Sequence, residues 1–136
     1  MLKKIPYTFL FFLAFTFALS AQTNSELKIK KENVYQFIYE LHGEDAKLFI
    51  SNNPDKIEEM KVFLENNIYF RQYKNIPKSV TEKLSSYVPL KPSSVQNEFN
   101  SKTFNPFLYE FEKVESPKKI HIDGTKYVLF INPNLK

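Results

Sequence analysis

The sequence predicts an α+β fold, in which two or three N-terminal helices pack on a small antiparallel sheet that ends in a C-terminal β-hairpin. Two observations predict it. Apolar residues recur at helical spacing between residues 33 and 67, and they alternate at strand spacing in segments between residues 68 and 131. Because the period changes once along the chain, we expect the helices to come first and to cover one face of the sheet.

The first 21 residues have the three parts of a secretory signal peptide. "MLKK" supplies positive charge, "PYTFLFFLAFTFAL" is an apolar run, and "ALSA" offers the small residues that a signal peptidase cleaves. A membrane anchor is the alternative, but a span needs about 20 apolar residues and this run is shorter. We expect residues 1–21 to be removed, leaving a flexible lead-in at 22–32 and a single domain at 33–136, in the periplasm or secreted, with no stable membrane anchor.

Composition excludes several classes of protein. The chain has 19 basic and 15 acidic residues, and loss of Lys3 and Lys4 with the signal leaves 17 basic residues. That excess is small, and the only tight basic cluster is the "KIKK" stretch, so we do not expect a nucleic-acid partner. The chain has no cysteine, which excludes disulfides, a thiol nucleophile and thiolate metal ligands.

The first helix is expected within "NVYQFIYELHG". Val34, Phe37, Ile38 and Leu41 stand at offsets 0, 3, 4 and 7, which places them on one helical stripe. Gly43 follows where a helix is commonly ended by a residue of positive φ. The next stretch, "EDAKLFIS", is expected to form a short helical turn.

A second long helix is expected after Asn53. Asn53 is a suitable N-cap, Pro54 fits the first helical position, and Asp55 suits the positive end of the helix dipole. The buried stripe consists of Ile57, Met60 and Leu64, and Asn66 with Asn67 ends the helix. This stripe needs a partner surface, which the sheet is expected to supply.

Strands are expected from residue 68 onward. "IYFRQY" alternates Ile68 and Phe70 with more polar residues, as a half-buried strand does. The proline-rich stretch 74–106 is long for a connection, so one short strand is expected within it, near "SYVPL". "PFLYEFEKV" alternates again, with aromatic residues on one side and Glu110 and Glu112 on the other.

The closing hairpin is expected to turn at Asp123 and Gly124, because Asp-Gly between two alternating apolar runs favours a two-residue turn. One face then carries the apolar set Ile120, Ile122, Tyr127, Leu129 and Ile131. The predicted cross-strand pairs are Ile122 with Thr125, His121 with Lys126, and Ile120 with Tyr127. Asp123 is expected to bond backbone groups of the turn, so His121 and Asp123 are not predicted to form a chemical site.

We find no constellation that predicts catalysis, a metal or a cofactor. His42, Glu44 and Asp45 follow one another closely, with His121 the other imidazole, but nothing fixes them as ligands. The serines lack a glycine-flanked elbow, and the two glycines do not provide a phosphate-binding loop. Paired acids among Glu110, Glu112 and Glu115 stay open as a glycosidase-like possibility, against the ordinary interpretation of a solvated sheet face.

The best binding candidates are Tyr69, Arg71 and Tyr73, which share one face of the strand predicted at 68–73. Tyrosine and arginine are enriched in binding surfaces, although a second layer of structure covering this face would explain the same pattern. The leading hypothesis is a non-catalytic interaction protein with a protein partner in the cell envelope. The alternatives are a small envelope enzyme that uses carboxylates or a His-centred metal, and a polysaccharide-binding protein that stacks sugars on tyrosines.

Several segments resemble a group of short, exported proteins of Bacteroidetes-type bacteria that have no assigned activity. The similar stretches are "LFISNNPDKIEEMKVFLENN", "KLSSYVPL", "TFNPFLYEFE" and "DGTKYVLFINP", which together cover much of the chain after the signal. The resemblance implies an envelope location. It supplies no catalytic residue, cofactor or ligand.

Overall fold

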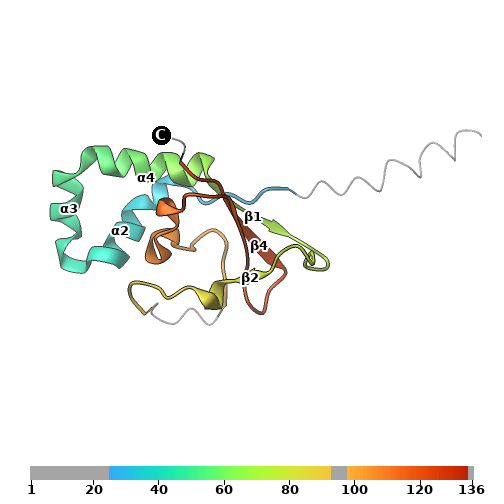
Figure 1. Ribbon diagram of the computed structural model, residues 1–136. Coiled ribbons are helices and arrows are strands. Elements are labelled where there is room, and N and C mark those ends of the chain that lie inside the picture. The colour runs from blue at the N-terminus through green and yellow to red at the C-terminus, as the bar shows by residue number, and fades with distance from the viewer. Residues whose placement is uncertain (1–24, 93–97, 135–136) are drawn as a thin grey trace, which may run out of the picture.

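The computed structural model describes residues 25–92 and 98–134, so the expected signal peptide lies outside the described residues. Within them the chain combines helices with one four-stranded sheet, which confirms the α+β class. Figure 1 shows the helices gathered at one end of the molecule and the strands at the other. The helices are α2 (Val34–His42), α3 (Ala46–Asn52) and α4 (Pro54–Asn66). In this part of the chain no helix is long and apolar enough to span a membrane.

The helices form largely as their apolar stripes predict. α2 buries Val34, Phe37 and Ile38, and the residue after it, Gly43, has a positive φ of 56°. α4 starts at Pro54 and buries Ile57, Met60, Phe63 and Leu64. The prediction that the Asn53 side chain caps α4 is wrong: its Nδ2 donates to the Phe49 carbonyl of α3 (2.9 Å).

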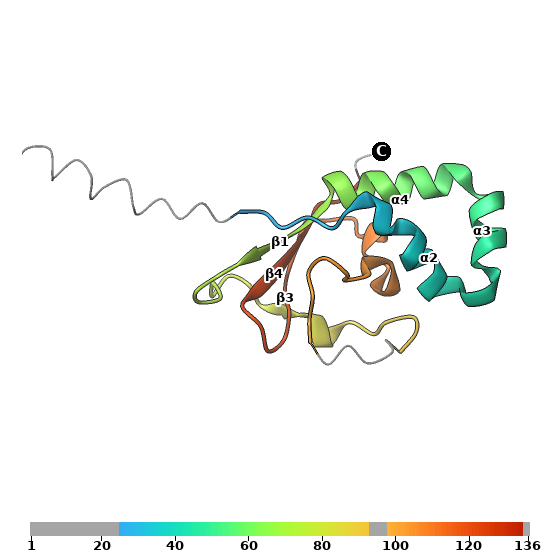
Figure 2. The same ribbon diagram turned by 180° about the vertical axis from the view of Figure 1, so that it is seen from behind.

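The sheet is mixed, which corrects the prediction of a purely antiparallel one. Its strand order is β1-β4-β3-β2, with β4 antiparallel to both β1 and β3 and with β2 parallel to β3. Figure 2 shows β1, β4 and β3 side by side. The strands are β1 (Ile68–Gln72), β2 (Glu82–Lys83), β3 (Lys118–His121) and β4 (Tyr127–Ile131). The chain crosses from one edge of the sheet to the other between β1 and β2, and β2 then runs in the same direction as β3.

Two strand predictions in the middle of the chain are wrong. The short strand lies at 82–83 and not near "SYVPL", where Val88 and Leu90 are exposed. Residues 106–114 form the 3-10 turns η4 (Pro106–Tyr109) and η5 (Phe111–Lys113) instead of a strand. The Asn105 side chain accepts from the Phe107 N–H (3.1 Å) and starts η4, and Glu110 between the turns has a φ of 55°. A helical start and a left-handed residue are both incompatible with a regular strand.

The C-terminal hairpin forms with a shifted register. Ile120 pairs with Leu129 and His121 with Val128, two residues away from the predicted partners. Ile122 pairs with Tyr127, its N–H donating to the Tyr127 carbonyl at 3.0 Å, so the loop holds residues 123–126. Because the shift is an even number of residues, the predicted core face is preserved.

The turn residues explain this shift. The Thr125 hydroxyl donates to the Ile122 carbonyl (2.7 Å) and accepts from the Tyr127 N–H (3.0 Å), which stabilises a longer loop. The prediction that Asp123 is used within the turn is wrong. Its carboxylate accepts from the Ser85 N–H (2.9 Å) and hydroxyl (2.8 Å) in the 3-10 turn η3 (Leu84–Ser86), and these bonds lower the pKa of Asp123.

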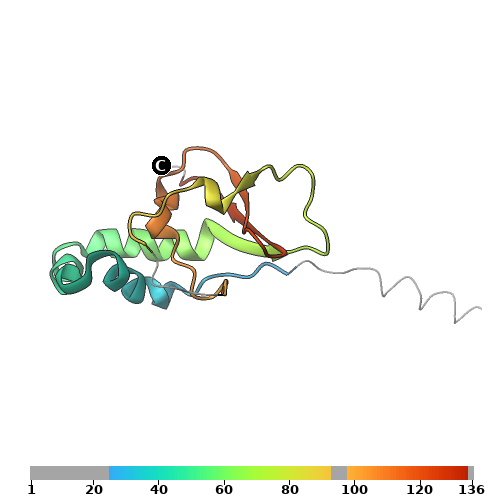
Figure 3. The same ribbon diagram turned by 90° about the horizontal axis from the view of Figure 1, so that it is seen from below.

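The segment before α2 is packed from Leu27 onward, in contrast to the flexible lead-in expected over residues 22–32. Leu27 and Phe70 exchange two backbone hydrogen bonds of 2.8 Å each, and Ile29 is buried in the core. Figure 3 shows this blue segment running alongside β1. Alternate residues of the segment face the core, as in an edge strand.

Candidate functional site

The face of the sheet that points away from the core carries both basic and aromatic side chains. Strand alternation and register place seven residues there, which we call the outer face: Tyr69, Arg71, Lys83, Lys119, His121, Val128 and Phe130. The opposite face carries Ile68, Phe70, Ile120, Leu129 and Ile131, all of which are buried in the core. The two predicted site residues of β1 therefore lie on the side away from the main core cluster, where Val128 and Phe130 are buried as well.

Tyr69 and Arg71 form a stack with Phe130 of β4. The Tyr69 and Phe130 rings are parallel within 1° and their centroids are 5.0 Å apart. The Arg71 guanidinium lies over both rings, 5.3 Å from the Tyr69 centroid and 5.2 Å from that of Phe130, and Lys119 Nζ is 5.8 Å from the Phe130 centroid. Such contacts between a cation and a ring hold each side chain in one position.

Arg71 also forms an ion pair with the segment beside β1. Its Nη2 donates to Glu26 Oε1 at 3.1 Å, and the Arg71 and Glu26 side chains keep 34% and 41% of their surface exposed. Hydrogen bonding to Glu26, and to a smaller extent to Tyr73, raises the pKa of Arg71. The three predicted binding residues, Tyr69, Arg71 and Tyr73, are thus neighbours, and all three are partly exposed.

Sequence reasoning missed Phe130, Lys119 and Glu26 as members of this site. Phe130 and Lys119 belong to the closing hairpin, and nothing in the sequence indicated that β1 would pair with β4. Glu26 stood in a segment expected to be loose. The alternation of Leu27 and Ile29 was the available signal that this segment packs beside a strand.

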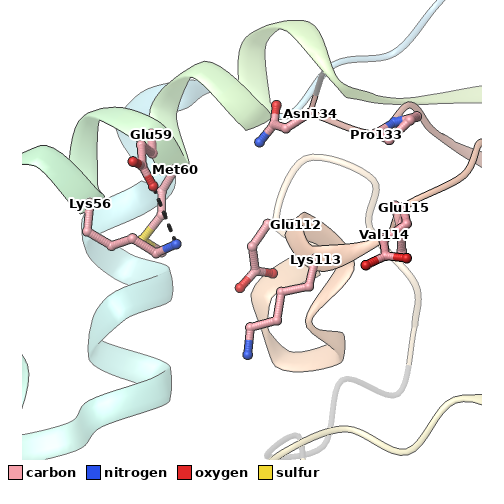
Figure 4. Close-up of a pocket in the computed structure, with 9 residues that line it drawn as sticks. All are labelled: Lys56, Glu59, Met60, Glu112, Lys113, Val114, Glu115, Pro133 and Asn134. Carbon is pink, nitrogen blue, oxygen red and sulfur yellow. Dashed lines mark ion pairs between the residues drawn. The ribbon is translucent and has the colours of Figure 1, made fainter. Parts of the chain in front are cut away.

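A second candidate site is a cavity of about 530 Å³ between α4, residues 112–115 and residues 133–134. Figure 4 shows its lining, with Lys56, Glu59 and Met60 of α4 on one side and Glu112 and Lys113 on the other. Lys56 and Glu59 form an ion pair of 3.6 Å across its rim. The lining residues are Lys56, Glu59, Met60, Glu112, Lys113, Val114, Glu115, Pro133 and Asn134.

Glu112 is a half-buried acid in the lining of this cavity. Its Oε2 atom is buried and has no hydrogen-bond partner among the described residues. Burial raises the pKa of Glu112, because water no longer stabilises the charged form. Glu115 lines the same cavity, whereas Glu110 pairs with Lys113. Two of the three acids singled out in the sequence therefore meet in one cavity.

The histidines are placed in separate structural roles. His42 stacks on Phe49 with ring centroids 4.2 Å apart, and His121 Nε2 donates to the Thr125 carbonyl (2.8 Å). Residues 25–92 and 98–134 contain no group of three or more His, Asp or Glu side chains positioned to hold a metal ion. Neither histidine is placed with acids in a way that suggests metal chemistry.

Comparison with known proteins gives no further assignment: no family model, no curated protein and no solved structure matches this chain. The resemblance to exported Bacteroidetes-type proteins stays an interpretation of the sequence. A functional proposal therefore rests on the outer face and on the Glu112 cavity.

Proposed function

We propose that this chain is a non-catalytic interaction protein of the periplasm or the cell exterior, and that its outer face binds a protein partner in the cell envelope. The observation that carries the proposal is the stack of Arg71 over Tyr69 and Phe130, which stays partly exposed. Arginine and aromatic residues dominate the binding energy of known interfaces. The signal-like pattern of residues 1–21 supports the location.

The stack suits binding because its side chains are already ordered. Phe130 is 8% exposed, and its ring is fixed against Tyr69. Binding a partner normally costs the entropy of ordering long side chains at the interface. A surface on which Arg71 is already held by two rings avoids part of that cost. The same contacts also stabilise the sheet, so binding has to be tested directly.

The test is site-specific photocrosslinking in the native envelope. A photoreactive amino acid replaces Lys119, which is exposed on the outer face, or Lys47, an exposed residue of α3 that serves as the matched control. We expect position 119 to give one reproducible protein adduct that position 47 does not give. The adduct should weaken when Arg71→Gln is added. Equal adducts from both positions, or none from position 119, would contradict the proposal.

A carboxylate enzyme is the second candidate, favoured by the meeting of Glu112 and Glu115 in one cavity. An acid whose pKa is raised by burial suits proton donation to a leaving group. The test is hydrolysis of envelope polysaccharide fragments, with Glu112→Gln expected to abolish the activity and Glu58→Gln, on another face of α4, to leave it unchanged. Hydrolysis that survives Glu112→Gln would exclude this site.

The remaining alternatives have less support. A polysaccharide binder needs exposed ring faces, but one face of Tyr69 lies against Phe130 and Arg71 lies over both rings. A His-centred metal enzyme needs several ligands in one place, and the described residues bring no such group together.

A further inference from the structure

We propose that the partner of the outer face is an acidic protein segment, and that Glu26 occupies the position of the partner's carboxylate while the protein is free. The inference rests on the proposed function, since it names the chemistry of the partner for the same surface. It adds that the N-terminal segment, through Glu26, competes with the partner for Arg71.

The charges of the outer face support an acidic partner. Of its seven strand residues, Arg71, Lys83 and Lys119 are basic and none is acidic. Lys83 and Lys119 are exposed. The other ionised pair at the sheet, Lys118 with Glu82, belongs to strand positions that point the opposite way. Complementary charge sets partner choice and the rate of encounter.

Arg71 already holds a carboxylate, but it does so incompletely. Only the contact between Nη2 and Glu26 Oε1 joins the two side chains, and Arg71 Nε is buried without a hydrogen-bond partner among the described residues. A guanidinium binds a carboxylate most strongly through two parallel hydrogen bonds. A partner carboxylate that engages a second guanidinium donor would therefore bind better than Glu26 does.

The Glu26 contact is also easily displaced. Both side chains are exposed by more than a third, so water and salt weaken their attraction. Glu26 comes just before Leu27, whose backbone bonds to Phe70 anchor the segment to β1. The carboxylate of Glu26 is thus free to leave Arg71 without unpairing Leu27 from the sheet.

The aromatic rings favour a carboxylate over a base or a sugar. Arg71 lies over the Tyr69 and Phe130 rings, and Lys119 approaches Phe130 as well. These cations take the place that a stacking base or sugar ring would need. A partner that approaches this surface contacts the positive charges of Arg71 and Lys119, which the rings hold in place. Such charges bind Asp and Glu side chains.

The test is fluorescence anisotropy of a labelled (Glu-Ala)5 peptide with the full chain purified after export. Peptides of (Gln-Ala)5 and (Lys-Ala)5 serve as controls for charge. We expect Glu26→Gln to tighten binding about two- to fivefold, because it removes a competing surface ion pair. Arg71→Gln should weaken binding by a similar factor, and Lys47→Gln on α3 should leave it unchanged.

A milder variant guards against misfolding. Arg71→Lys keeps the positive charge but loses the planar fork, so it should fold and still bind (Glu-Ala)5 less tightly than the wild type. Higher salt should weaken all binding. Binding that is unaffected by both Glu26→Gln and Arg71→Lys would overturn the proposal.

The two proposals fail separately. A crosslinked protein at position 119 without any binding of (Glu-Ala)5 overturns the acidic partner and leaves the interaction function standing. Binding of (Glu-Ala)5 through Arg71 without a crosslinked protein supports the chemistry of the face and overturns a resident protein partner. Absence of both results overturns both.

Discussion

The two faces of the sheet bury their side chains in different ways. On the inner face, Phe70 is completely buried, and its ring lies 5.3 Å from that of Phe99 and 5.6 Å from that of Phe104. On the outer face, Phe130 is almost as well buried, but the groups over its ring are the cationic ends of Arg71 and Lys119. The inner ring is therefore surrounded by other aromatic rings, whereas the outer ring is covered by Tyr69 on the sheet and by two cationic side-chain ends.

Exposed area alone therefore does not distinguish a core from a candidate binding surface. Phe70 is held by apolar contacts with Phe99 and Phe104, whose rings would lose favourable burial if they moved into water. The cover over Phe130 is held by cation–ring contacts and by one exposed ion pair, each weak and sensitive to salt. An inner-face residue should therefore control stability, and an outer-face residue should affect stability less.

The largest effect is expected from Phe70→Ala. Truncation leaves a cavity among aromatic rings that are themselves fixed, so the free energy of unfolding should fall by about 3–5 kcal/mol. Phe130→Ala is the matched substitution, and it should cost about 2 kcal/mol because flexible side chains can close over the gap. Urea unfolding measures both. Equal losses would show that the two faces are sealed in the same manner.

A smaller effect is expected from Arg71→Met, which keeps an unbranched side chain over the rings and removes its charge. The loss of the Glu26 pair and of the cation–ring contacts should lower the free energy of unfolding by about 1 kcal/mol. Since exposed charges are screened by salt, the loss should shrink between 50 and 500 mM salt, because the Debye length falls from about 14 Å to about 4 Å. Urea unfolding at the two salt concentrations would measure this, and a loss that does not change with salt would assign the stabilisation to packing alone.

The smallest effect is expected at the Glu112 cavity, where one carboxylate oxygen, Oε2, is buried without a hydrogen-bond partner among the described residues. Burial raises the pKa of folded Glu112 above its unfolded value, so the folded state binds more protons between the two values and stability falls as pH rises through that window. Glu112→Gln should remove this fall and stabilise the protein at pH 7 by about 0.5 kcal/mol. Thermal unfolding from pH 4 to pH 7 is the measurement. The exposed Glu115→Gln should show no such change, and a similar change in both variants would refute the explanation.

The elements that the sequence predicted are those whose faces are defined locally. α2, α4, β1 and β4 each carry a regular apolar stripe or alternation, and each forms where that pattern lies. The core face of the hairpin survived even a shift of register. Such patterns involve only residues a few positions apart, so they can be recognised in the sequence without knowledge of the tertiary structure.

The sequence predictions that were wrong share one cause: each concerned a residue whose structure depends on a partner far away in the chain. The alternating residues 106–114 pack against the helices instead of joining the sheet: the Phe107 ring lies 6.2 Å from that of Phe37 in α2 and 5.8 Å from that of Phe63 in α4. Asp123 serves Ser85, a residue that is 38 positions away in the chain. Sequence alone does not specify which distant groups will be available.

The residues of the candidate site likewise fall into those predicted by a local pattern and those that depend on long-range pairing. Tyr69 and Arg71 were found because they alternate on one strand. Phe130, Lys119 and Glu26 join them only through the pairing of β1 with β4, of β4 with β3, and of the N-terminal segment with β1. The Glu112 cavity likewise depends on where α4 lies relative to η5, which no local pattern encodes.

The strand order β1-β4-β3-β2 also determines when the sheet can be completed. The outer strands β1 and β2 come before the central strands β3 and β4 in the chain. Ile68 of β1 can therefore pair with Ile131 of β4 only after the 62 residues between them have been synthesised. Pairing over such a separation makes folding slow. While the chain is still being synthesised, its helices can form but its sheet cannot. We therefore expect commitment to the folded state only after β4 has been synthesised.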